Sequence, residues 1–292
     1  MSLYENQYNI SAENTANKTN KAKLYVKDWG QGEPVVLIHG WPLSSDSWDW
    51  IAIKLVEAGF RVVSYDRRGF GRSEQTWSGY DYDTFADDLR GVIEDKQLTH
   101  VTLVGFSMGG GEIARYLSRH QAKDIKQVAL ISSVVPFLLK TDNHPEGVDG
   151  SVFQGMIEGI LDERPKFFNH FFKDFYGVGL LSHAVSDEFI KWNTQVAMQA
   201  SLKATVDCVR AFAYTDFRPD LAAFTVPVLV IHGTADKTVP IGITAHAVQK
   251  ALPNAKLIEY VDEPHGVLAT QQERVAQDLL DFLGVQHSVD RF

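Results

Sequence analysis

Residues 101–111 read VTLVGFSMGGG, and this run carries the strongest structural signal in the chain. Its first part, 101–106, is an apolar segment typical of a buried strand, and the residues after it have helical spacing. Ser107 stands between them, two positions after Gly105 and two before Gly109. A strand that turns so sharply into a helix needs glycine at both places, because a Cβ would hold the two elements apart. The run therefore predicts a nucleophile elbow, a strained turn that raises the serine hydroxyl above the edge of a sheet.

Six further apolar segments alternate with amphipathic stretches along the chain. Several are continuous runs of Val, Ile and Leu, as strands buried on both faces of a sheet must be. The expected strands, with that of the elbow, are 24–28, 34–39, 61–66, 101–106, 127–132, 227–232 and 256–261. This alternation predicts an α/β fold with a mostly parallel central sheet and helices on both faces. A leading hairpin that pairs 8–11 with 24–28 is a further expectation.

The alternation stops between Val135 and Phe224, where no segment has the character of a buried strand. Helical spacing is found there in 152–161, 165–175 and 194–212. We expect this segment to be an inserted helical cap, rich in aromatic residues that join it to the core. The expected parts of the chain are a polar extension at 1–22, a core in two pieces at 23–134 and 225–292, and the cap at 135–224.

Length and composition favour one globular domain with an insertion. The chain has 292 residues, of which 45% are hydrophobic, enough to fill a sizeable core. Its net charge of -9 and pI near 5.6 argue against nucleic acid or an anionic membrane as a partner, since both bind clustered Lys and Arg. Residues 1–22 lack the apolar core of a signal peptide, and the single cysteine, Cys208, excludes an internal disulfide. We therefore expect a soluble cytoplasmic protein.

The serine of the elbow needs partners, because a hydroxyl is a weak nucleophile without a base and an orienting acid. In α/β proteins with such an elbow, the acid follows the serine along the chain and the histidine comes last. Asp236 follows the expected strand 227–232, and His265 follows the expected strand 256–261. Both belong to the edge formed by the carboxyl ends of the strands, where catalytic groups of such sheets gather. The candidate triad is Ser107, Asp236 and His265.

Neighbouring ionisable residues have other expected roles. His39 and His232 each end a strand, so each is expected to brace the following loop through a hydrogen bond. Asp262 and Glu263 lie too near His265 along the chain to orient it easily. Asp236 is therefore the better acid.

Acyl transfer also needs donors for the negative charge that develops on a carbonyl oxygen. In this arrangement one donor is the amide after the nucleophile, here Met108, and the second comes from the loop after the strand 34–39. That loop begins Gly40, Trp41, Pro42. Because Pro42 has no N–H, the amide of Trp41 is the expected second donor. The Trp41 indole is expected to form a wall of the acyl pocket.

The run DRRGFGRS at 66–73 follows another strand end. Its arginines are compatible with an anion site, but a glycine-rich phosphate loop with a following Lys and Ser/Thr is missing from this run. A loop brace made by hydrogen bonds from arginine to carbonyl groups is the better interpretation.

Together these motifs resemble the α/β-hydrolase superfamily and, within it, the bacterial arylesterases and cofactor-free haloperoxidases, also called perhydrolases. The resemblance extends from about residue 23 to residue 285. The matching segments are HGWPLSSDSW from 39, DRRGFGRS from 66, YDTFADDL from 82, GFSMGGGE from 105, ASLKATVDC from 200, TDFRPDL from 215, HGTADKTVP from 232 and PHG from 264.

The resemblance implies an enzyme that acts on small carboxylic esters through an acyl-serine, without metal, heme or another cofactor. Hydrogen peroxide can replace water in the second step and give a peracid that oxidises halide. A proline at position 42 is the residue that this family associates with better use of peroxide. The resemblance also favours a homo-oligomer. The implied apolar pocket matches Trp41, Pro42, Val134, Leu138, Phe171, Phe175 and Val239.

Three other functions share parts of this sequence pattern. Hydrolysis of a lactone or an amide uses the same machinery and stays open. A small-molecule receptor of the same fold is disfavoured, because all the parts of the chemistry occur in order. A dehalogenase or epoxide hydrolase is excluded, because it needs a carboxylate nucleophile where this chain has Ser107.

Overall fold

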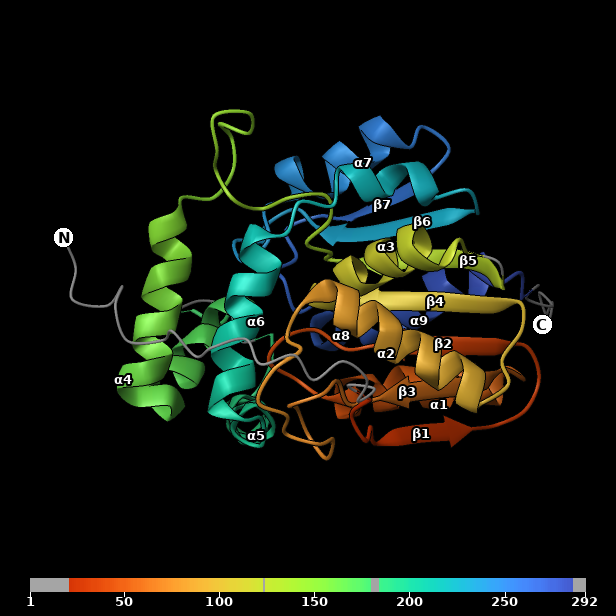
Figure 1. The fold of residues 1–292 in the computed structure, drawn as a ribbon, viewed down its shortest axis with the longest axis horizontal. Helices are drawn as coiled ribbons and strands as arrows, with labels where there is room; N and C mark the ends of the chain where they lie inside the picture. The colour runs from red at the N-terminus through yellow and green to blue at the C-terminus, as the bar shows by residue number, and fades with distance from the viewer. Residues whose placement is uncertain (1–20, 123, 180–183, 286–292) are drawn as a thin grey trace, which may run out of the picture.

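The computed structural model describes residues 21–122, 124–179 and 184–285, which form a sheet flanked by helices (Figure 1). The strand order is β1-β3-β2-β4-β5-β6-β7, and neighbours run parallel except β1 and β3. The strands are β1 (Val26–Trp29), β2 (Pro34–Ile38), β3 (Arg61–Tyr65), β4 (Val101–Phe106), β5 (Ile125–Ile131), β6 (Val228–Gly233) and β7 (Lys256–Tyr260). All seven expected strands are confirmed. The hairpin expected between 8–11 and 24–28 lies outside the described residues, and β1 pairs with β3 instead.

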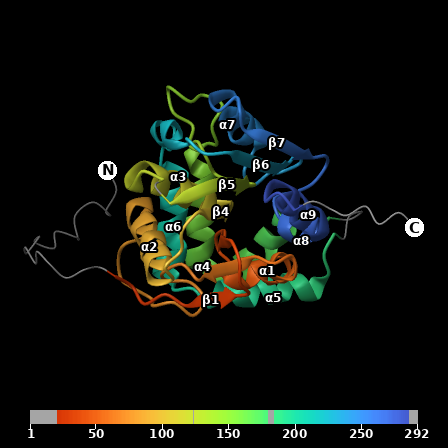
Figure 2. The same cartoon turned by 90° about the vertical axis from the view of Figure 1, so that its right-hand side faces the viewer.

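Helices cover both faces of the sheet, as the alternating pattern predicts. On one face α1 (Asp49–Glu57) packs against α9 (Gln272–Phe282), and on the other α2 (Tyr82–Asp95) packs against α3 (Met108–His120) (Figure 2). The shorter helices are η1 (Ser45–Trp48), η2 (Pro219–Ala223), η3 (Ile241–Ile243), α7 (Ala245–Ala251) and α8 (Val267–Thr270). Within the described residues, no helix is both long and apolar enough to cross a membrane.

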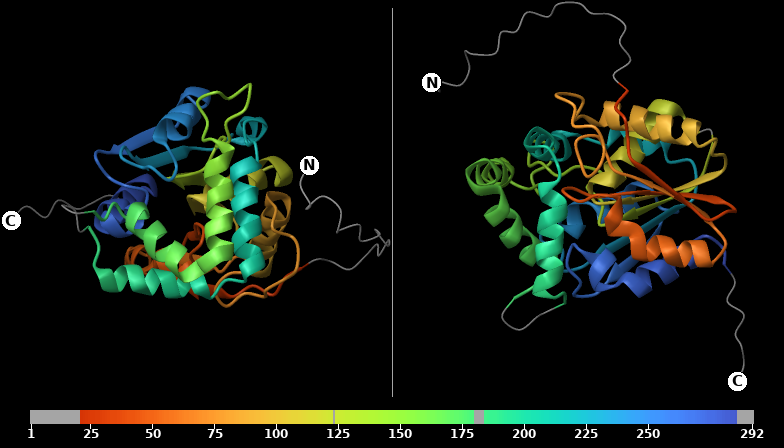
Figure 3. Two further views of the ribbon diagram at one scale, coloured as in Figure 1. Left: turned by 90° about the vertical axis from the view of Figure 1, so that its left-hand side faces the viewer. Right: turned by 90° about the horizontal axis from the view of Figure 1, so that it is seen from below.

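Three helices from the segment between β5 and β6 lie together beyond the carboxyl ends of the parallel strands (Figures 1 and 3). These cap helices are α4 (Gly150–Phe175), α5 (Asp187–Met198) and α6 (Leu202–Tyr214). The backbone of α4 leaves helical geometry at Glu163, two residues before Pro165, whose ring excludes a regular turn there.

The expected single helix over 194–212 is wrong, because the chain makes two helices there. Ser201 is the residue directly before α6. Its hydroxyl caps the start of this helix by accepting a hydrogen bond from the amide of Ala204. In the same way, Ser186 caps α5 by accepting from the amide of Phe189. Ser201, a serine N-cap inside the expected range, marks the boundary that the apolar periodicity alone does not show.

The elbow at Ser107 has the close packing that its glycines predict. Ser107 has φ 53° and ψ -115°, a strained conformation for a residue with a side chain. A Cβ on Gly105 would lie 2.6 Å from the carbonyl carbon of Gly109, and one on Gly109 would lie 2.5 Å from the carbonyl oxygen of Ile38. Helix α3 therefore approaches β4 at Gly105 and β2 at Gly109 so closely that only hydrogen fits at these two positions.

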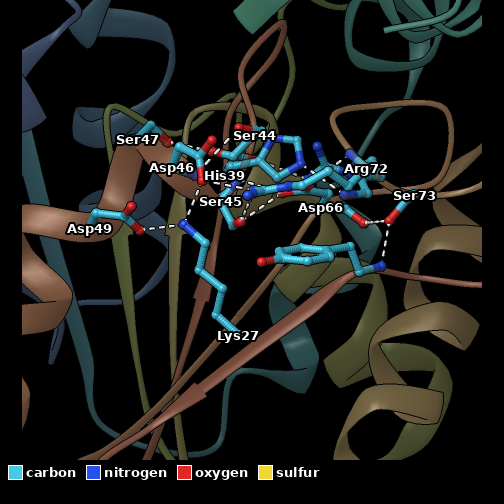
Figure 4. A network of polar contacts seen from close by, with 12 residues as sticks. Lys27, His39, Ser44, Ser45, Asp46, Ser47, Asp49, Asp66, Arg72 and Ser73 are labelled. Atoms are coloured by element: carbon cyan, nitrogen blue, oxygen red, sulfur yellow. Dashed lines mark hydrogen bonds and ion pairs between the residues drawn. The ribbon is translucent and has the colours of Figure 1, made fainter. Parts of the chain in front are cut away.

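A polar network fixes the loops after β2 and β3 to each other (Figure 4). The buried carboxylate of Asp66 accepts hydrogen bonds from the amide and hydroxyl of Ser45 and from the amide and guanidinium of Arg72. Arg72 also reaches Asp46, which with Asp49 holds the ammonium of Lys27 from β1. Although burial acts to raise it, these donors lower the pKa of Asp66 to about 2.

We expect Gly105→Ala to lower the free energy of unfolding by about 2 kcal/mol or more, because its methyl group would have to displace the backbone of α3. The matched control is Gly155→Ala on the exposed side of α4, where a Cβ meets no atom within 4 Å. That control should gain up to about 1 kcal/mol, since alanine favours a helix more than glycine does. Denaturation in urea checks both, and equal midpoints for the two variants would contradict the close crossing.

We expect Asp66→Asn to destabilise the protein by about 2 kcal/mol or more at neutral pH, because its amide group cannot accept from every donor around it. The lowered pKa means that the carboxylate contributes fully above its ordinary value of 3.8 and loses this contribution as the pH falls toward about 2. The difference from the original protein should therefore narrow in urea titrations below about pH 4. Asp162→Asn, at an exposed position of α4, is the control and should change little at either pH.

Candidate active site

The three residues of the candidate triad come together at the carboxyl edge of the sheet. Ser107 follows β4, Asp236 follows β6 and His265 follows β7. The Nε2 atom of His265 lies 2.9 Å from the Oγ of Ser107, and its Nδ1 lies 2.6 Å from the Oδ2 of Asp236. The side chains thus form one hydrogen-bonded chain, although the residues are separated by up to 158 positions in the sequence.

Asp236 is held as an anion. Its Oδ1 accepts hydrogen bonds from the amides of Thr238 and Val239, at 2.9 and 2.8 Å. Burial acts to raise the pKa of Asp236, but the neighbouring His265 and His232 outweigh it and hold the pKa well below its ordinary value. An ionised acid places a proton on Nδ1 of His265 and leaves Nε2 to accept from the serine hydroxyl.

The loop of His265 is fixed from two directions. The hydroxyl of Ser132, just after β5, donates to the carbonyl of His265, and the amide of Gly266 donates to the carbonyl of Phe175 at the end of α4. The rings of Phe175 and Phe106 pack against the imidazole with centroids 4.7 and 5.2 Å away. The imidazole is 1% exposed, so the base works in a nearly dry environment.

The expected oxyanion donors are the amides of Trp41 and Met108, at the ends of β2 and β4. Neither amide donates a hydrogen bond to any residue that the structure describes. The Trp41 indole donates instead to the carbonyl of Thr205 in α6, at 3.0 Å, and packs edge-on against Phe171. Trp41 therefore links the oxyanion loop directly to the cap helices.

His39 braces the oxyanion loop, as predicted. Its Nδ1 lies 2.9 Å from the carbonyl of Gly40, and its Nε2 accepts from the amide of Arg67. Burial, with the charge of Arg67, lowers the pKa of His39 to about 3, so the ring is neutral and both nitrogens are engaged. His232 also makes its predicted brace, because its Nε2 lies 2.9 Å from the carbonyl of Val239 in the acid loop.

The arginine run forms a brace, but its chemistry differs from the prediction. Arg67 does donate to a carbonyl, that of His39, at 2.9 Å. Its other partner is the buried carboxylate of Glu112 on α3, while Arg68 pairs with Asp88 and Arg72 with Asp66. The expectation of carbonyl partners is therefore mostly wrong, since carboxylates neutralise guanidinium groups that lie in the interior.

The residues expected to line the acyl pocket are all at this edge of the sheet. Phe171 stacks between Trp41 and Phe175, which in turn contacts His265. The amide of Val134 donates to the carbonyl of Ser107, so this residue borders the nucleophile. Pro42, Leu138 and Val239 are buried. Contact of these side chains with an acyl group stays a prediction.

Sequence reasoning missed two residues that the structure places at the site. Phe106 occupies the variable position before Ser107 and packs on His265, and its signal was an aromatic residue inside the elbow itself. Glu112 lies one turn and a half into α3, where Arg67 and the Tyr65 hydroxyl contact it. A carboxylate between glycines and an apolar helix face is the signal of a buried partner.

The described residues contain no group of three or more His, Cys, Asp and Glu side chains placed to hold a metal ion. Cys208 is buried in α6.

Comparison with known proteins agrees with this geometry. The family model described as alpha/beta hydrolase fold matches residues 33–271. A non-heme chloroperoxidase of Kitasatospora aureofaciens is 41% identical over 89% of this chain and 96% of its own length. A bifunctional esterase/perhydrolase of Acinetobacter calcoaceticus is 39% identical over 89% of this chain and 95% of its own. The crystal structure of a bromoperoxidase from Bacillus anthracis has a TM-score of 0.88 and 45% identity, over 90% of this chain and 96% of that one.

Fold, elbow and relatives agree, and the matches cover most of both chains. The chain belongs to the α/β-hydrolase fold family and, within it, to the group of the non-heme haloperoxidases and esterase/perhydrolases.

Proposed function

We propose that this protein hydrolyses small carboxylic esters through an acyl-enzyme on Ser107, and that hydrogen peroxide can replace water in the second step. The observation that carries the proposal is the hydrogen-bonded chain from Ser107 through His265 to Asp236. The two free amides beside it, of Trp41 and Met108, supply the donors that a developing oxyanion requires.

Each step of the proposed reaction follows from this geometry. The Oγ of Ser107 attacks the ester carbonyl while the Nε2 of His265 takes its proton, and the negative charge on the carbonyl oxygen is stabilised by the two amides. His265 then gives the proton to the leaving alcohol, and Ser107 keeps the acyl group. A water or peroxide molecule transfers a proton to His265 and attacks the acyl carbon. His265 then returns this proton to the Oγ of Ser107 as the bond between Oγ and the acyl carbon breaks, which releases a carboxylic acid or a peracid.

Burial supports small substrates. Ser107 is 6% exposed and Trp41 is 3% exposed, and aromatic side chains of α4 pack against the Trp41 indole. A site enclosed in this way favours short acyl groups, because a longer chain would have to displace packed aromatic rings. We propose that 135–224 acts as one cap that sets this limit.

The use of peroxide is supported by the relatives and by one residue. The relatives include an esterase/perhydrolase and chloroperoxidases, and this chain has Pro42 directly after the donor Trp41. Proline constrains the backbone of the residue before it, so it shapes the part of the loop that faces the acyl group. The carbonyl of Trp41 is the group that we propose accepts a hydrogen bond from the attacking peroxide.

Two further points, the location of the protein in the cell and its assembly, extend the proposal. We propose that the protein acts in the cytoplasm, which is consistent with its single cysteine. We also propose that it forms a homo-oligomer, as its resemblance to the perhydrolases suggests.

We expect Ser107→Ala to reduce turnover of p-nitrophenyl acetate by about 10⁴-fold or more, because the acyl intermediate can no longer form. Intact-protein mass spectrometry should also show that a fluorophosphonate adds to the original protein and not to the variant. The control is Ser78→Ala, which changes an exposed serine away from the site and should keep both properties. Full activity of the Ser107 variant would refute the proposed function.

We expect Pro42→Leu to lower the ratio of peracid to carboxylic acid that forms from a short ester in the presence of peroxide. The physical reason is that leucine relaxes the constraint on the Trp41 backbone and moves the carbonyl that receives peroxide. Ester hydrolysis without peroxide is measured beside it, so that a general loss of activity is separated from a change in nucleophile. An unchanged ratio would contradict the role of Pro42.

A further inference from the structure

Two imidazoles, not one, share a single oxygen of the triad acid. The Oδ2 atom of Asp236 lies 2.6 Å from Nδ1 of His265 and 3.1 Å from Nε2 of His232. The same Nε2 of His232 lies 2.9 Å from the carbonyl of Val239. The N–H on Nε2 of His232 is therefore shared between two acceptors, the carbonyl of Val239 and the carboxylate of Asp236.

The surroundings of His232 fix where its proton lies. Its side chain is 1% exposed, and its Nδ1 is buried without a hydrogen-bond partner among the residues that the structure describes. A second N–H on this nitrogen would be buried without an acceptor, which is unfavourable. Nε2, in contrast, has two acceptors. His232 is therefore a neutral imidazole with its proton on Nε2.

The N–H of His232 acts on the charge of Asp236 and not on its position. The other carboxylate oxygen, Oδ1, is already held by the amides of Thr238 and Val239. The carboxylate thus keeps its orientation without His232. What His232 adds is the positive end of an N–H dipole beside the oxygen that stabilises His265 when His265 is protonated.

We propose that His232 acts on the triad through Asp236: its N–H weakens the hold of this carboxylate on protonated His265 and so extends activity to lower pH. This inference rests on the proposed function, because it concerns the base of that reaction. Two residues at different strand ends, His232 near the end of β6 and His265 after β7, compete for one anion, and the balance between them sets how readily the base is freed.

No other ionisable side chain in the described part of the chain contacts this carboxylate. Lys237 is adjacent in sequence but exposed to solvent. Glu263 lies in the loop before His265, and its carboxylate accepts hydrogen bonds from Thr270 and Gln271 instead. The pH dependence expected below therefore has His232 as its source.

The test compares His232→Met, which removes the donor, with His232→Gln, whose amide nitrogen can occupy the place of Nε2. We measure kcat/KM for p-nitrophenyl acetate against pH. The acid-side midpoint should rise by roughly half a pH unit or more in the Met variant and return toward the original value in the Gln variant. A fall in activity with no shift, a shift to lower pH, or equal shifts in both variants would overturn the proposal.

A second measurement observes the proton of His232 in the unaltered protein and does not depend on turnover. In protein labelled with ¹⁵N-histidine, the signal of His232 at neutral pH should show a proton on Nε2 and none on Nδ1. His232→Gln identifies the signal. A proton on Nδ1 would overturn the proposal even if the esterase activity is present, and a missing esterase activity would leave this result standing.

Discussion

At Ser107 the chain passes from β4 into α3 within one residue, and the resulting contact leaves room only for hydrogen at Gly105 and Gly109. This turn places the serine hydroxyl at the carboxyl edge of the sheet, beside the loops that follow β6 and β7. It also leaves the amide of Met108 at the start of α3 with no helical acceptor. One strained turn thus carries both the proposed nucleophile and one of the two proposed oxyanion donors, and Asp236 and His265 are placed relative to it.

Buried charged side chains fix the loop after β2, which carries the second proposed oxyanion donor, Trp41. The oxyanion loop is tied to α3 because Arg67 donates to the carbonyl of His39 and pairs with Glu112. Further along the same loop, the carboxylate of Asp66 accepts hydrogen bonds from the amide of Ser45 and the guanidinium of Arg72. Buried ion pairs of this kind add little net stability but make a change of geometry costly, because any displacement leaves a charge without its partner. A site that depends on fixed donors gains from such stiffness.

The sequence was sufficient for those parts that have a local cause. The strands follow from continuous apolar runs, and the grouping of Ser107, Asp236 and His265 follows from strand ends that meet at one edge of a parallel sheet. The break between α5 and α6 was missed because the same apolar spacing runs through both helices, although α5 ends at Met198 and Ser201 caps the start of α6. Carboxylate partners such as Glu112 lie far along the chain from their arginines, so pairing them requires the fold.

Trp41 takes part in two structures at once, the loop after β2 and the contact with the cap helices, and this makes the core and the cap difficult to separate. Its amide is the proposed oxyanion donor, while its indole donates a hydrogen bond to the carbonyl of Thr205 in α6. The cap helices are thus not an exchangeable module on a self-sufficient core. A cap taken from another protein would have to bring a carbonyl group to the same point in space, or the loop that carries Trp41 would lose one of its anchors. Divergence in this family is therefore expected to proceed by changes within the cap that keep the hydrogen bond between the Trp41 indole and the backbone of α6.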